Sequence, residues 1–363
     1  MKNTKKIIAL LLALVLVLAA CGGNNNDADK PADENGTEEN ETTEPNNENE
    51  ENTEDEGNAD SGEAKKIAVL LYDATDPYIG TVRKAMEEID ANDDSITLEF
   101  HDGQNDAAAQ TNQLDNIISQ GVDGILVNIV EITGAPTFIE KLEDSGIPYL
   151  FFNRDMTESF EGTDKTIFIG TNAPEAGVMQ GEMFVDYAKS NDKWDRNGDG
   201  VVQYAILHGG LDNAEAKARS EYSVKTVEEA GFKVEELANQ VAEWNTAKAK
   251  EATDAWLQSF PNDLDVIFAN NDGMALGAVE ALKQAGIDDI PVYGVDAIQE
   301  ALVSVENGEM AGTVKQDNVG MAESTIALIK NRIEGKDWLE GTDYEIFADE
   351  RNNSVRIPYQ KVN

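Results

Sequence analysis

The sequence predicts an α/β fold made of two doubly wound parallel-sheet lobes. Strand-like and helix-like segments alternate along residues 65–363, and glycines follow several of the predicted helices. About 300 residues are also too many for one compact core and suit two lobes.

Short β-branched and aliphatic runs are predicted as strands, and longer segments with a helical period as helices. The predicted strands are 67–72, 96–101, 124–128, 148–152, 166–170, 202–208, 233–237, 266–269, 292–295 and 312–315. The predicted helices are 77–92, 106–120, 136–145, 174–190, 213–230, 246–260, 272–285, 298–307 and 319–334. Helices are expected to end at Gly121, Gly146, Gly231 and Gly286. Strands separated by helices indicate parallel sheets that are covered on both faces.

The first residues are typical of an export signal. Three lysines among the first six residues precede an apolar run over 7–18, and Leu-Ala-Ala-Cys ends at Cys21. We interpret 1–20 as a signal peptide. The ending resembles a bacterial lipobox, which implies cleavage before Cys21 and lipidation of its thiol; an ordinary signal peptide with an incidental cysteine is the alternative. Cys21 is the only cysteine, so no intramolecular disulfide and no thiolate metal site are expected.

The next segment is strongly acidic. Residues 22–64 hold sixteen Asp and Glu, one Lys and no aromatic or large aliphatic residue. Such a chain cannot bury enough apolar surface to fold, so a disordered linker is predicted over 21–64, tethering the protein to the extracellular face of the membrane. With the leader (+3) and this segment (−15) set aside, residues 65–363 carry −31 of the total −43. This charge disfavours nucleic acid and anionic surfaces as partners.

In open α/β sheets, ligands bind beyond the carboxyl ends of the strands. The polar residues predicted at those ends are Asp73, Asp76, Asn128, Asn153, Asn270, Asn271, Asp272 and Asp296. No glycine-rich phosphate loop occurs among them. Neither His101 nor His208 belongs to a catalytic or metal-hydrolase pattern. We therefore predict a binding protein rather than an enzyme.

Four side chains could contact a neutral sugar. Trp244 and Tyr78 each stand near the start of a predicted helix and could stack on a sugar ring, or could simply pack in the core. Glu215 and Arg219 are four residues apart and share one helix face. They could face a ligand, or form a surface ion pair of little energetic value.

A calcium loop is predicted after the fourth long helix. Residues 195–200 read D-x-N-x-D-G, with Gln203 at the ninth position, as in the first part of an EF-hand. The twelfth position is Ile206 rather than a bidentate Glu, and a strand follows instead of a helix, so a complete EF-hand is disfavoured. A calcium loop closed by a distant carboxylate and a plain polar turn both stay open.

From about residue 65 to 358 the chain resembles the periplasmic galactose/glucose-binding proteins, within the ribose-type sugar-binding family of ABC importers. The passages that carry the resemblance are Val82-Arg83-Lys84-Ala85, Gln104-Asn105-Asp106, Ile139-Glu140-Lys141, Phe151-Phe152-Asn153, Trp194-Asp195, Ala269-Asn270-Asn271-Asp272, Gly277 to Leu282, Gly294-Val295-Asp296-Ala297 and Ala311-Gly312-Thr313-Val314.

The resemblance implies a type I periplasmic binding protein, whose two lobes are joined by a three-strand hinge and close on a sugar. We assign residues 65–148 plus 317–348 to the N-terminal lobe and 149–316 plus 349–363 to the C-terminal lobe. The sugar-binding residues implied are Asp76, Tyr78, Asn128, Asn213, Glu215, Arg219, Trp244, Asn271, Asp296 and Gln316. The implied calcium ligands are Asp195, Asn197, Asp199, the Val201 carbonyl, Gln203 and Asp265.

Several positions depart from the family pattern. Tyr78 stands in place of a Phe, Asn213 of a His, Glu215 of an Asp and Gln316 of an Asn, while Asp265 replaces the Glu that closes the calcium site. The resemblance implies a hexose, glucose or galactose, as the ligand, and these departures leave the epimer and anomer open.

The expected function is that of a monomeric, lipid-anchored protein that delivers hexose to a membrane ABC permease, with calcium as a structural cofactor. The alternative is a receptor that presents a ligand to a membrane sensor, or serves chemotaxis or autoinducer signalling. A repressor that shares the sugar lobes is disfavoured, because an export signal stands where its DNA-binding domain would be.

Overall fold

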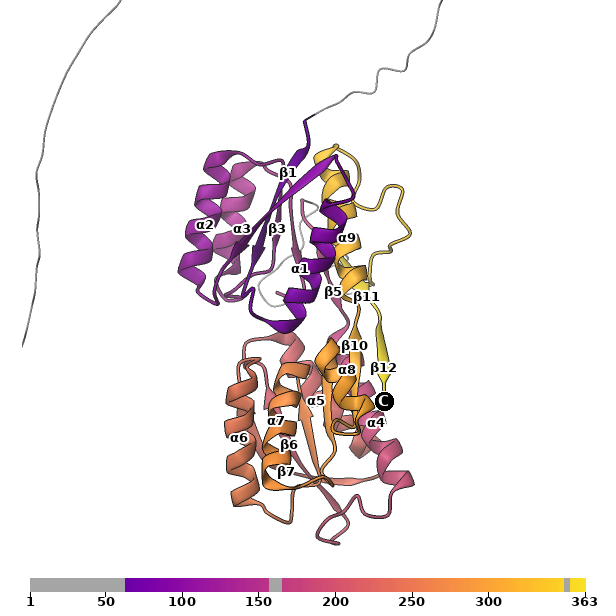
Figure 1. Ribbon diagram of the computed structural model, residues 1–363. Helices are drawn as coiled ribbons and strands as arrows, with labels where there is room; N and C mark the ends of the chain where they lie inside the picture. The colour runs from indigo at the N-terminus through magenta and orange to yellow at the C-terminus, as the bar shows by residue number, and fades with distance from the viewer. Residues whose placement is uncertain (1–62, 157–164, 349–352) are drawn as a thin grey trace, which may run out of the picture. The chain divides into compact units, whose positions relative to one another are not determined.

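The computed structural model describes residues 63–156, 165–348 and 353–363 (Figure 1). The predicted signal peptide, Cys21 and the acidic linker up to residue 62 lie outside the described residues. Within the described part of the chain, none of the helices is long and apolar enough to cross a membrane.

The first sheet contains six parallel strands in the order β11-β5-β4-β3-β1-β2. They are β1 (Lys65–Leu71), β2 (Ile96–Asp102), β3 (Gly124–Val127), β4 (Tyr149–Phe152), β5 (Phe168–Thr171) and β11 (Ser354–Ile357). Continuous apolar runs such as Tyr149–Phe152 suit central parallel strands, because helices cover both of their faces. One face packs against α1 (Pro77–Asp90) and α9 (Asn318–Ile333), and the other against α2 (Ala107–Gln120) and α3 (Ala135–Ser145).

The second sheet has the order β12-β10-β9-β8-β6-β7, with only β12 antiparallel to its neighbour. Its strands are β6 (Val201–His208), β7 (Lys233–Val241), β8 (Val266–Ala269), β9 (Val292–Asp296), β10 (Gly312–Gln316) and β12 (Tyr359–Val362). One face packs against α4 (Ala173–Ser190) and α5 (Ala214–Glu229). The other face packs against α6 (Thr246–Ser259), α7 (Asp272–Ala285) and α8 (Gln299–Glu306).

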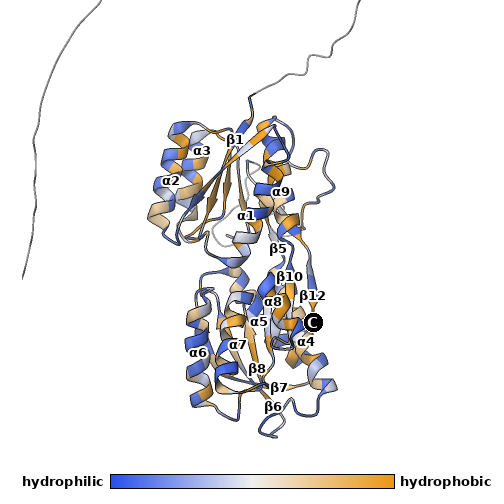
Figure 2. Ribbon diagram, in the orientation of Figure 1, coloured by the Kyte–Doolittle hydropathy of each residue, from blue (hydrophilic) through white to orange (hydrophobic). Residues whose placement is uncertain are grey.

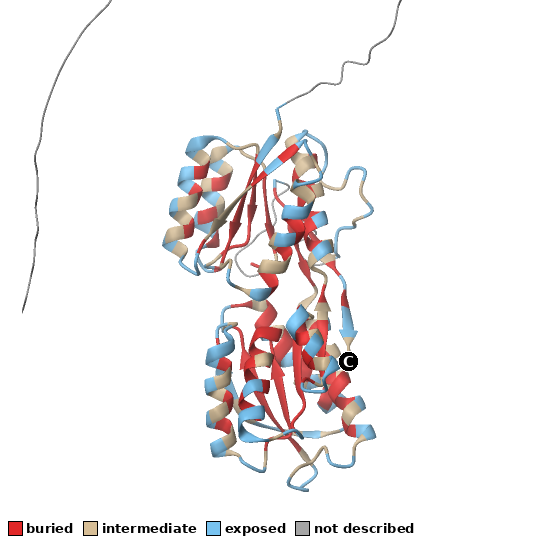
Figure 3. Cartoon of the chain, viewed as in Figure 1, coloured by how far each residue is buried: buried red, intermediate tan, exposed pale blue. Residues whose placement is uncertain are grey.

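Burial follows this layered arrangement. The strands are largely orange in Figure 2 and red in Figure 3, while the outward faces of helices such as α2 and α6 are blue or tan. The largest fully buried side chains include Phe151 and Phe152 in the first sheet and Phe268 and Tyr293 in the second. Each sheet therefore has its own apolar core on each face, and the predicted fold class of two doubly wound lobes is confirmed.

The lobe boundaries differ from the prediction. Residues 149–171 were assigned to the C-terminal lobe, but β4 pairs with β3 and β5 pairs with β4 in the first sheet. β11, also assigned to the C-terminal lobe, pairs with β5. The chain therefore crosses between the sheets after β5, after β10 and between β11 and β12. The predicted boundary was wrong because strand order depends on pairing between distant segments, which the local sequence pattern does not record.

Helix caps at the carboxyl ends of the strands place polar side chains along one edge of each sheet. Asp76, Asp106, Asn213, Asn245 and Asn271 each accept a hydrogen bond from a backbone N–H in the first turn of the following helix. Such caps satisfy N–H groups that have no partner within the helix. The caps also fix where these side chains stand relative to the strand ends.

Candidate ligand-binding site

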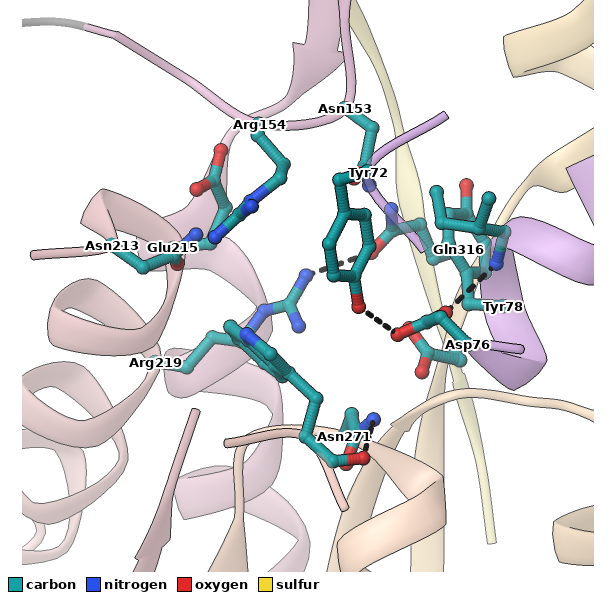
Figure 4. A pocket seen from close by; sticks show the side chains of 13 residues that line it. Tyr72, Asp76, Tyr78, Asn153, Arg154, Asn213, Glu215, Arg219, Asn271 and Gln316 are labelled. Atoms are coloured by element: carbon teal, nitrogen blue, oxygen red, sulfur yellow. Dashed lines mark hydrogen bonds between the residues drawn. The ribbon is translucent and has the colours of Figure 1, made fainter. Parts of the chain in front are cut away.

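A pocket lies where the carboxyl ends of the strands of both lobes meet, and Figure 4 shows its side chains. It holds about 390 Å³ of empty space, including its opening to solvent. Its lining residues come from segments far apart in the sequence, and most of them carry polar or charged groups. The lining residues are Tyr72, Asp76, Tyr78, Ile79, Asn153, Arg154, Asn213, Glu215, Arg219, Trp244, Asn271, Asp296 and Gln316.

All of the predicted sugar-contact residues except Asn128 line this pocket. Asn128 is fully buried beneath it. Its Oδ1 accepts from the backbone N–H of Tyr72 at 3.2 Å, and its Nδ2 donates to Asn153 Oδ1 at 3.1 Å. The structure thus places Asn128 behind the pocket wall. It holds Asn153 so that the Asn153 amide nitrogen is left as the group available to a ligand.

Tyr72, Asn153 and Arg154 form a wall of the pocket, and none of the three was among the predicted sugar-binding residues. Nη1 of Arg154 donates to the carbonyls of Ile129 and Val130 at 2.9 and 2.8 Å, and its guanidinium carbon lies 4.5 Å from the centre of the Tyr72 ring. Asn153 and Arg154 follow β4 directly, so their position after a strand end was the available signal. Asn153 was accordingly among the polar residues predicted at strand ends, although it was not included in the predicted sugar-binding set.

Asp76 is held from two sides. Its Oδ1 accepts from the backbone N–H of Ile79 at 2.9 Å, and its Oδ2 accepts from the Tyr72 hydroxyl at 2.5 Å. Burial raises the pKa of the Asp76 carboxyl, although both hydrogen bonds act in the opposite direction. Asp76 is therefore a fixed hydrogen-bond acceptor on the wall contributed by the first lobe.

Arg219 connects the pocket to the second sheet and to β12. Its Nη1 donates to the carbonyl of Asn270 at 2.7 Å, and its Nη2 donates to Gln316 Oε1 at 2.7 Å and to the Tyr359 hydroxyl at 2.9 Å. The guanidinium is buried, and its Nε has no protein partner among the described residues. Gln316 Oε1 is therefore already occupied by Arg219.

Glu215 makes a hydrogen bond from one lobe to the other. Its Oε1 accepts from the backbone N–H of Asp155 at 2.9 Å, and its Oε2 is buried without a partner in the described chain. Asp155 in turn pairs with Arg356 of β11 at 2.7 Å. Burial, and then the negative charge of Asp155, raise the pKa of the Glu215 carboxyl to about 7, while the charge of Arg219 lowers it. Glu215 and Arg219 are thus both buried in the pocket, and do not form the surface ion pair considered above.

Trp244 and Asp296 both have backbone conformations that non-glycine residues rarely adopt. Trp244 has φ 61°, and Asp296 and the next residue, Ala297, have φ 126° and 57°. Asn271 caps α7 through its Oδ1 and donates from Nδ2 to the Trp244 carbonyl at 3.4 Å. Strained backbone of this kind concentrates at functional sites.

The carboxyl of Asp296 is buried in the pocket. Burial and then the charge of Asp272 raise the pKa of the Asp296 carboxyl well above its ordinary value.

Comparison with known proteins identifies the family. A periplasmic binding protein domain matches residues 67–337, most of the chain. The chain belongs to this family. Similar proteins include the D-galactose/methyl-galactoside binding periplasmic protein MglB of Haemophilus influenzae, 36% identical over 81% of this chain and 88% of that protein. A putative rhizopine-binding protein of Rhizobium meliloti is 32% identical over 69% of this chain and 79% of that protein.

A solved structure agrees with this periplasmic binding protein in fold. An ABC transporter solute binding protein from Bacillus halodurans, crystallised with myo-inositol, gives a TM-score of 0.70 at 29% identity. The match covers 84% of this chain and 96% of that one. The similar proteins are solute-binding proteins and not enzymes, so the prediction of a binding protein is confirmed.

The loop predicted to bind calcium connects α4 with β6 of this binding protein. Asp195 accepts from the backbone N–H groups of Gly198 and Gly200 at 2.6 and 2.7 Å, and Asp199 accepts from Gln203 Nε2 at 2.8 Å. Gln203 Oε1 is buried without a partner in the described chain, which suits an oxygen ligand for a hard cation.

The carboxylate expected to close the calcium loop is buried. The two oxygens of Asp265 accept from the backbone N–H groups of Arg196 and Gln203, both at 2.8 Å, and burial raises the pKa of Asp265 to about 6. Across the described residues, no group of three or more His, Cys, Asp or Glu is arranged to hold a metal. The loop still offers an unpartnered oxygen donor, Gln203 Oε1, and calcium binding stays a prediction.

Proposed function

We propose that this periplasmic binding protein captures a neutral hexose, glucose or galactose, between its lobes and delivers it to an ABC importer. The observation that carries the proposal is the pocket itself. It combines carboxylates, carboxamides and guanidinium groups from both lobes with an indole ring at the strand ends. Vicinal hydroxyl groups both donate and accept hydrogen bonds, so a sugar would use such a set fully.

The charges of the pocket favour a neutral ligand. Asp76, Glu215 and Asp296 bring three carboxyl groups, and Arg154 and Arg219 bring two guanidinium groups. Raised pKa values at all three carboxyls, caused mainly by burial, reduce the negative charge further. An anionic solute would also meet a protein with a formal charge of −43. A neutral polyhydroxylated ring satisfies these groups without burying an unpaired charge.

The names of the relatives mention different ligands. One names D-galactose, others name rhizopine, xylitol and ribose, and the structure at 29% identity contains myo-inositol. The relative named for galactose is 36% identical over 81% of this chain, which supports a hexose first. Cyclic polyols belong in the same test because they present a similar ring of hydroxyl groups.

A thermal-shift screen followed by calorimetry tests the proposal. The purified protein is melted with glucose, galactose, ribose, xylose, xylitol, myo-inositol or buffer alone. A ligand that binds only the folded state raises Tm by mass action, by about 2.7 kcal/mol of stability at a hundredfold excess over Kd. Glucose or galactose should give the largest shift. No shift with either hexose at millimolar concentration would overturn the proposal, and a larger shift with myo-inositol would reassign the ligand.

Anchoring through Cys21 is a second part of the proposal. It is supported by the apolar leader that ends in Leu-Ala-Ala-Cys. In a bacterial host, the wild-type protein should sediment with membranes, and Cys21→Ser should be found in the soluble fraction. Equal partition of the two proteins would exclude a lipid anchor at this residue.

A structural calcium ion in the loop 195–203 and a monomeric state complete the proposal. The loop has the D-x-N-x-D-G order that calcium loops use, and Gln203 Oε1 lacks a protein partner within the described residues. Light scattering coupled to gel filtration, with and without hexose, tests the monomer. A dimer mass in both conditions would contradict it.

A further inference from the structure

Gly209 lies directly against the indole of Trp244. A Cβ atom built on Gly209 would stand 2.2, 2.3 and 2.4 Å from Cζ2, Cη2 and Cε2 of that ring. Ordinary van der Waals contact begins at about 3.4 Å. The smallest side chain would therefore have to displace the indole, or the backbone beneath it, by about 1 Å.

The backbone beneath the indole is fixed. The N–H of Gly209 donates to Asn270 Oδ1 at 3.0 Å, and the amide nitrogen of Asn270 donates to Ser220 Oγ at 3.0 Å. Asn270 is itself buried, and its backbone N–H donates to the carbonyl of Leu207 in β6. Movement of Gly209 away from the ring would break these buried hydrogen bonds. The backbone at Gly209 is therefore expected to move less than the indole.

The backbone that carries the indole is also held. The N–H of Ala242 donates to the carbonyl of His208, which joins the segment before Trp244 to the residue before Gly209. The Trp244 carbonyl accepts from Asn271, and Trp244 itself has φ 61°. Because hydrogen bonds hold both backbones in place, we expect the clash with a new methyl group to be relieved chiefly by a tilt of the indole ring toward the pocket.

We propose that Gly209 is a positioning residue that sets how deeply the Trp244 indole sits, and so leaves room for a sugar ring to stack on it. This inference rests on the proposed hexose function. Glycine is required here for the space that its missing side chain leaves, since its φ lies outside the left-handed region. Gly209 does not line the pocket, so it acts through Trp244 rather than by touching the ligand.

The neighbouring glycine provides a matched control. A Cβ on Gly210 would meet only Asn213 Cβ, at 4.0 Å, so Gly210→Ala adds the same methyl group one residue away without a clash. By calorimetry with the hexose identified in the screen, Gly209→Ala should weaken binding at least tenfold. Gly210→Ala should stay within about twofold of the wild type. Wild-type affinity in Gly209→Ala would overturn the proposal.

A double variant distinguishes positioning from a general effect on the fold. Trp244→Phe removes the larger part of the ring that faces Gly209, so adding Gly209→Ala to Trp244→Phe should change affinity less than threefold. The same loss in both backgrounds would contradict the proposal. If Gly209→Ala alone fails to fold, restoration of folding by Trp244→Phe supports a clash with the indole, and failure in both backgrounds overturns it.

A spectroscopic measurement without ligand separates this inference from the proposed function. The fluorescence of Trp244 is obtained as the difference between each protein and its Trp244→Phe counterpart. Gly209→Ala should shift this difference spectrum toward the red, and Gly210→Ala should not. If the wild type binds no sugar, the hexose proposal fails while the spectrum still tests the position of the indole. An unshifted spectrum overturns the positioning role.

Discussion

The buried carboxylate of Asp272 accepts a hydrogen bond from the backbone N–H of Ile298 at 3.0 Å. Its other oxygen accepts from the Thr313 hydroxyl at 2.6 Å. Ile298 follows the strained pair Asp296 and Ala297, which carries the Asp296 carboxyl into the pocket. Asp272 thus fixes the end of a turn whose backbone would otherwise relax, although Asp272 itself does not line the pocket.

Asp272→Asn should weaken hexose binding about tenfold and lower the Tm of the ligand-free protein. The amide replaces one acceptor oxygen with a donor. Either the N–H of Ile298 or the hydroxyl hydrogen of Thr313 then loses its acceptor, and a buried group left unpaired costs about 1–3 kcal/mol. Calorimetry and thermal melts measure the two effects. Ser304→Ala, which alters another buried polar side chain of the same lobe, is the control and should leave affinity unchanged. Wild-type affinity in Asp272→Asn would show that the conformation of the turn at Asp296 does not depend on the Asp272 carboxylate.

Trp244→Ala and Asp296→Ala should each abolish the thermal shift caused by hexose while the protein still folds. The first loses a stacking surface worth about 1–3 kcal/mol, by analogy with base stacking on aromatic side chains. The second loses a pocket carboxyl. Leu211→Ala changes a side chain that is 65% exposed near the same edge, and should keep the full shift. If both pocket variants bind normally, the ligand lies elsewhere.

Glu215→Gln should stabilise the ligand-free protein more at pH 8 than at pH 5. A carboxyl whose pKa rises from 4.5 to about 7 on folding contributes stability below pH 4.5 that is lost as pH rises through about 7. The amide introduced by Glu215→Gln cannot ionise, so the variant does not lose this stability as pH rises, and its amide oxygen can still accept from the N–H of Asp155. The difference is on the order of 2–3 kcal/mol at most.

Thermal melts between pH 5 and pH 8 measure this dependence on pH. Glu87→Gln, which changes an exposed glutamate paired with Arg83, is the control and should lack the gain in stability at pH 8 that is expected of Glu215→Gln. The charged neighbours of Glu215 are Asp155, Arg219 and, through Asp155, Arg356. An equal stabilisation by Glu215→Gln at both pH values would mean that Glu215 ionises normally in the folded protein.

Removal of calcium should lower Tm. We expect EDTA to destabilise the wild-type protein and added calcium to restore it, because a cation bound only by the folded state contributes to stability by mass action. Asp199→Asn keeps the size of an exposed loop residue and removes its charge, so EDTA should have a smaller effect on this variant. A melting temperature that does not respond to EDTA would leave the loop as a polar turn held by Asp195 and Asp199.

Much of the fold could be predicted because its elements are local. Alternating apolar strands and capped helices predicted nearly every element within a few residues, including α8 between the short strands β9 and β10. The last two strands, β11 and β12, were not predicted as strands. Each is four residues long, and each owes its place to a partner far along the sequence, β5 or β10.

The candidate site could be predicted where a motif carried it, but not where tertiary packing decides. Position after a strand end pointed to Asp76, Asn271 and Asp296, which do line the pocket. The same rule failed for Asn128, because its side chain turns back to bond Tyr72 and Asn153. The direction of an amide side chain depends on neighbours that only the folded chain supplies.

The three crossings of the chain have a consequence for synthesis. β11 and β12 together occupy only residues 354–362, yet one pairs in the first sheet and the other in the second. A growing chain therefore cannot complete either sheet until residues 354–362 have left the ribosome. Pairing between distant segments is slow to form, so we expect the nascent protein to complete its fold later than a protein whose lobes are built one after the other. Such a delay would suit export of the chain before it folds, which is the route that the predicted signal peptide over 1–20 implies.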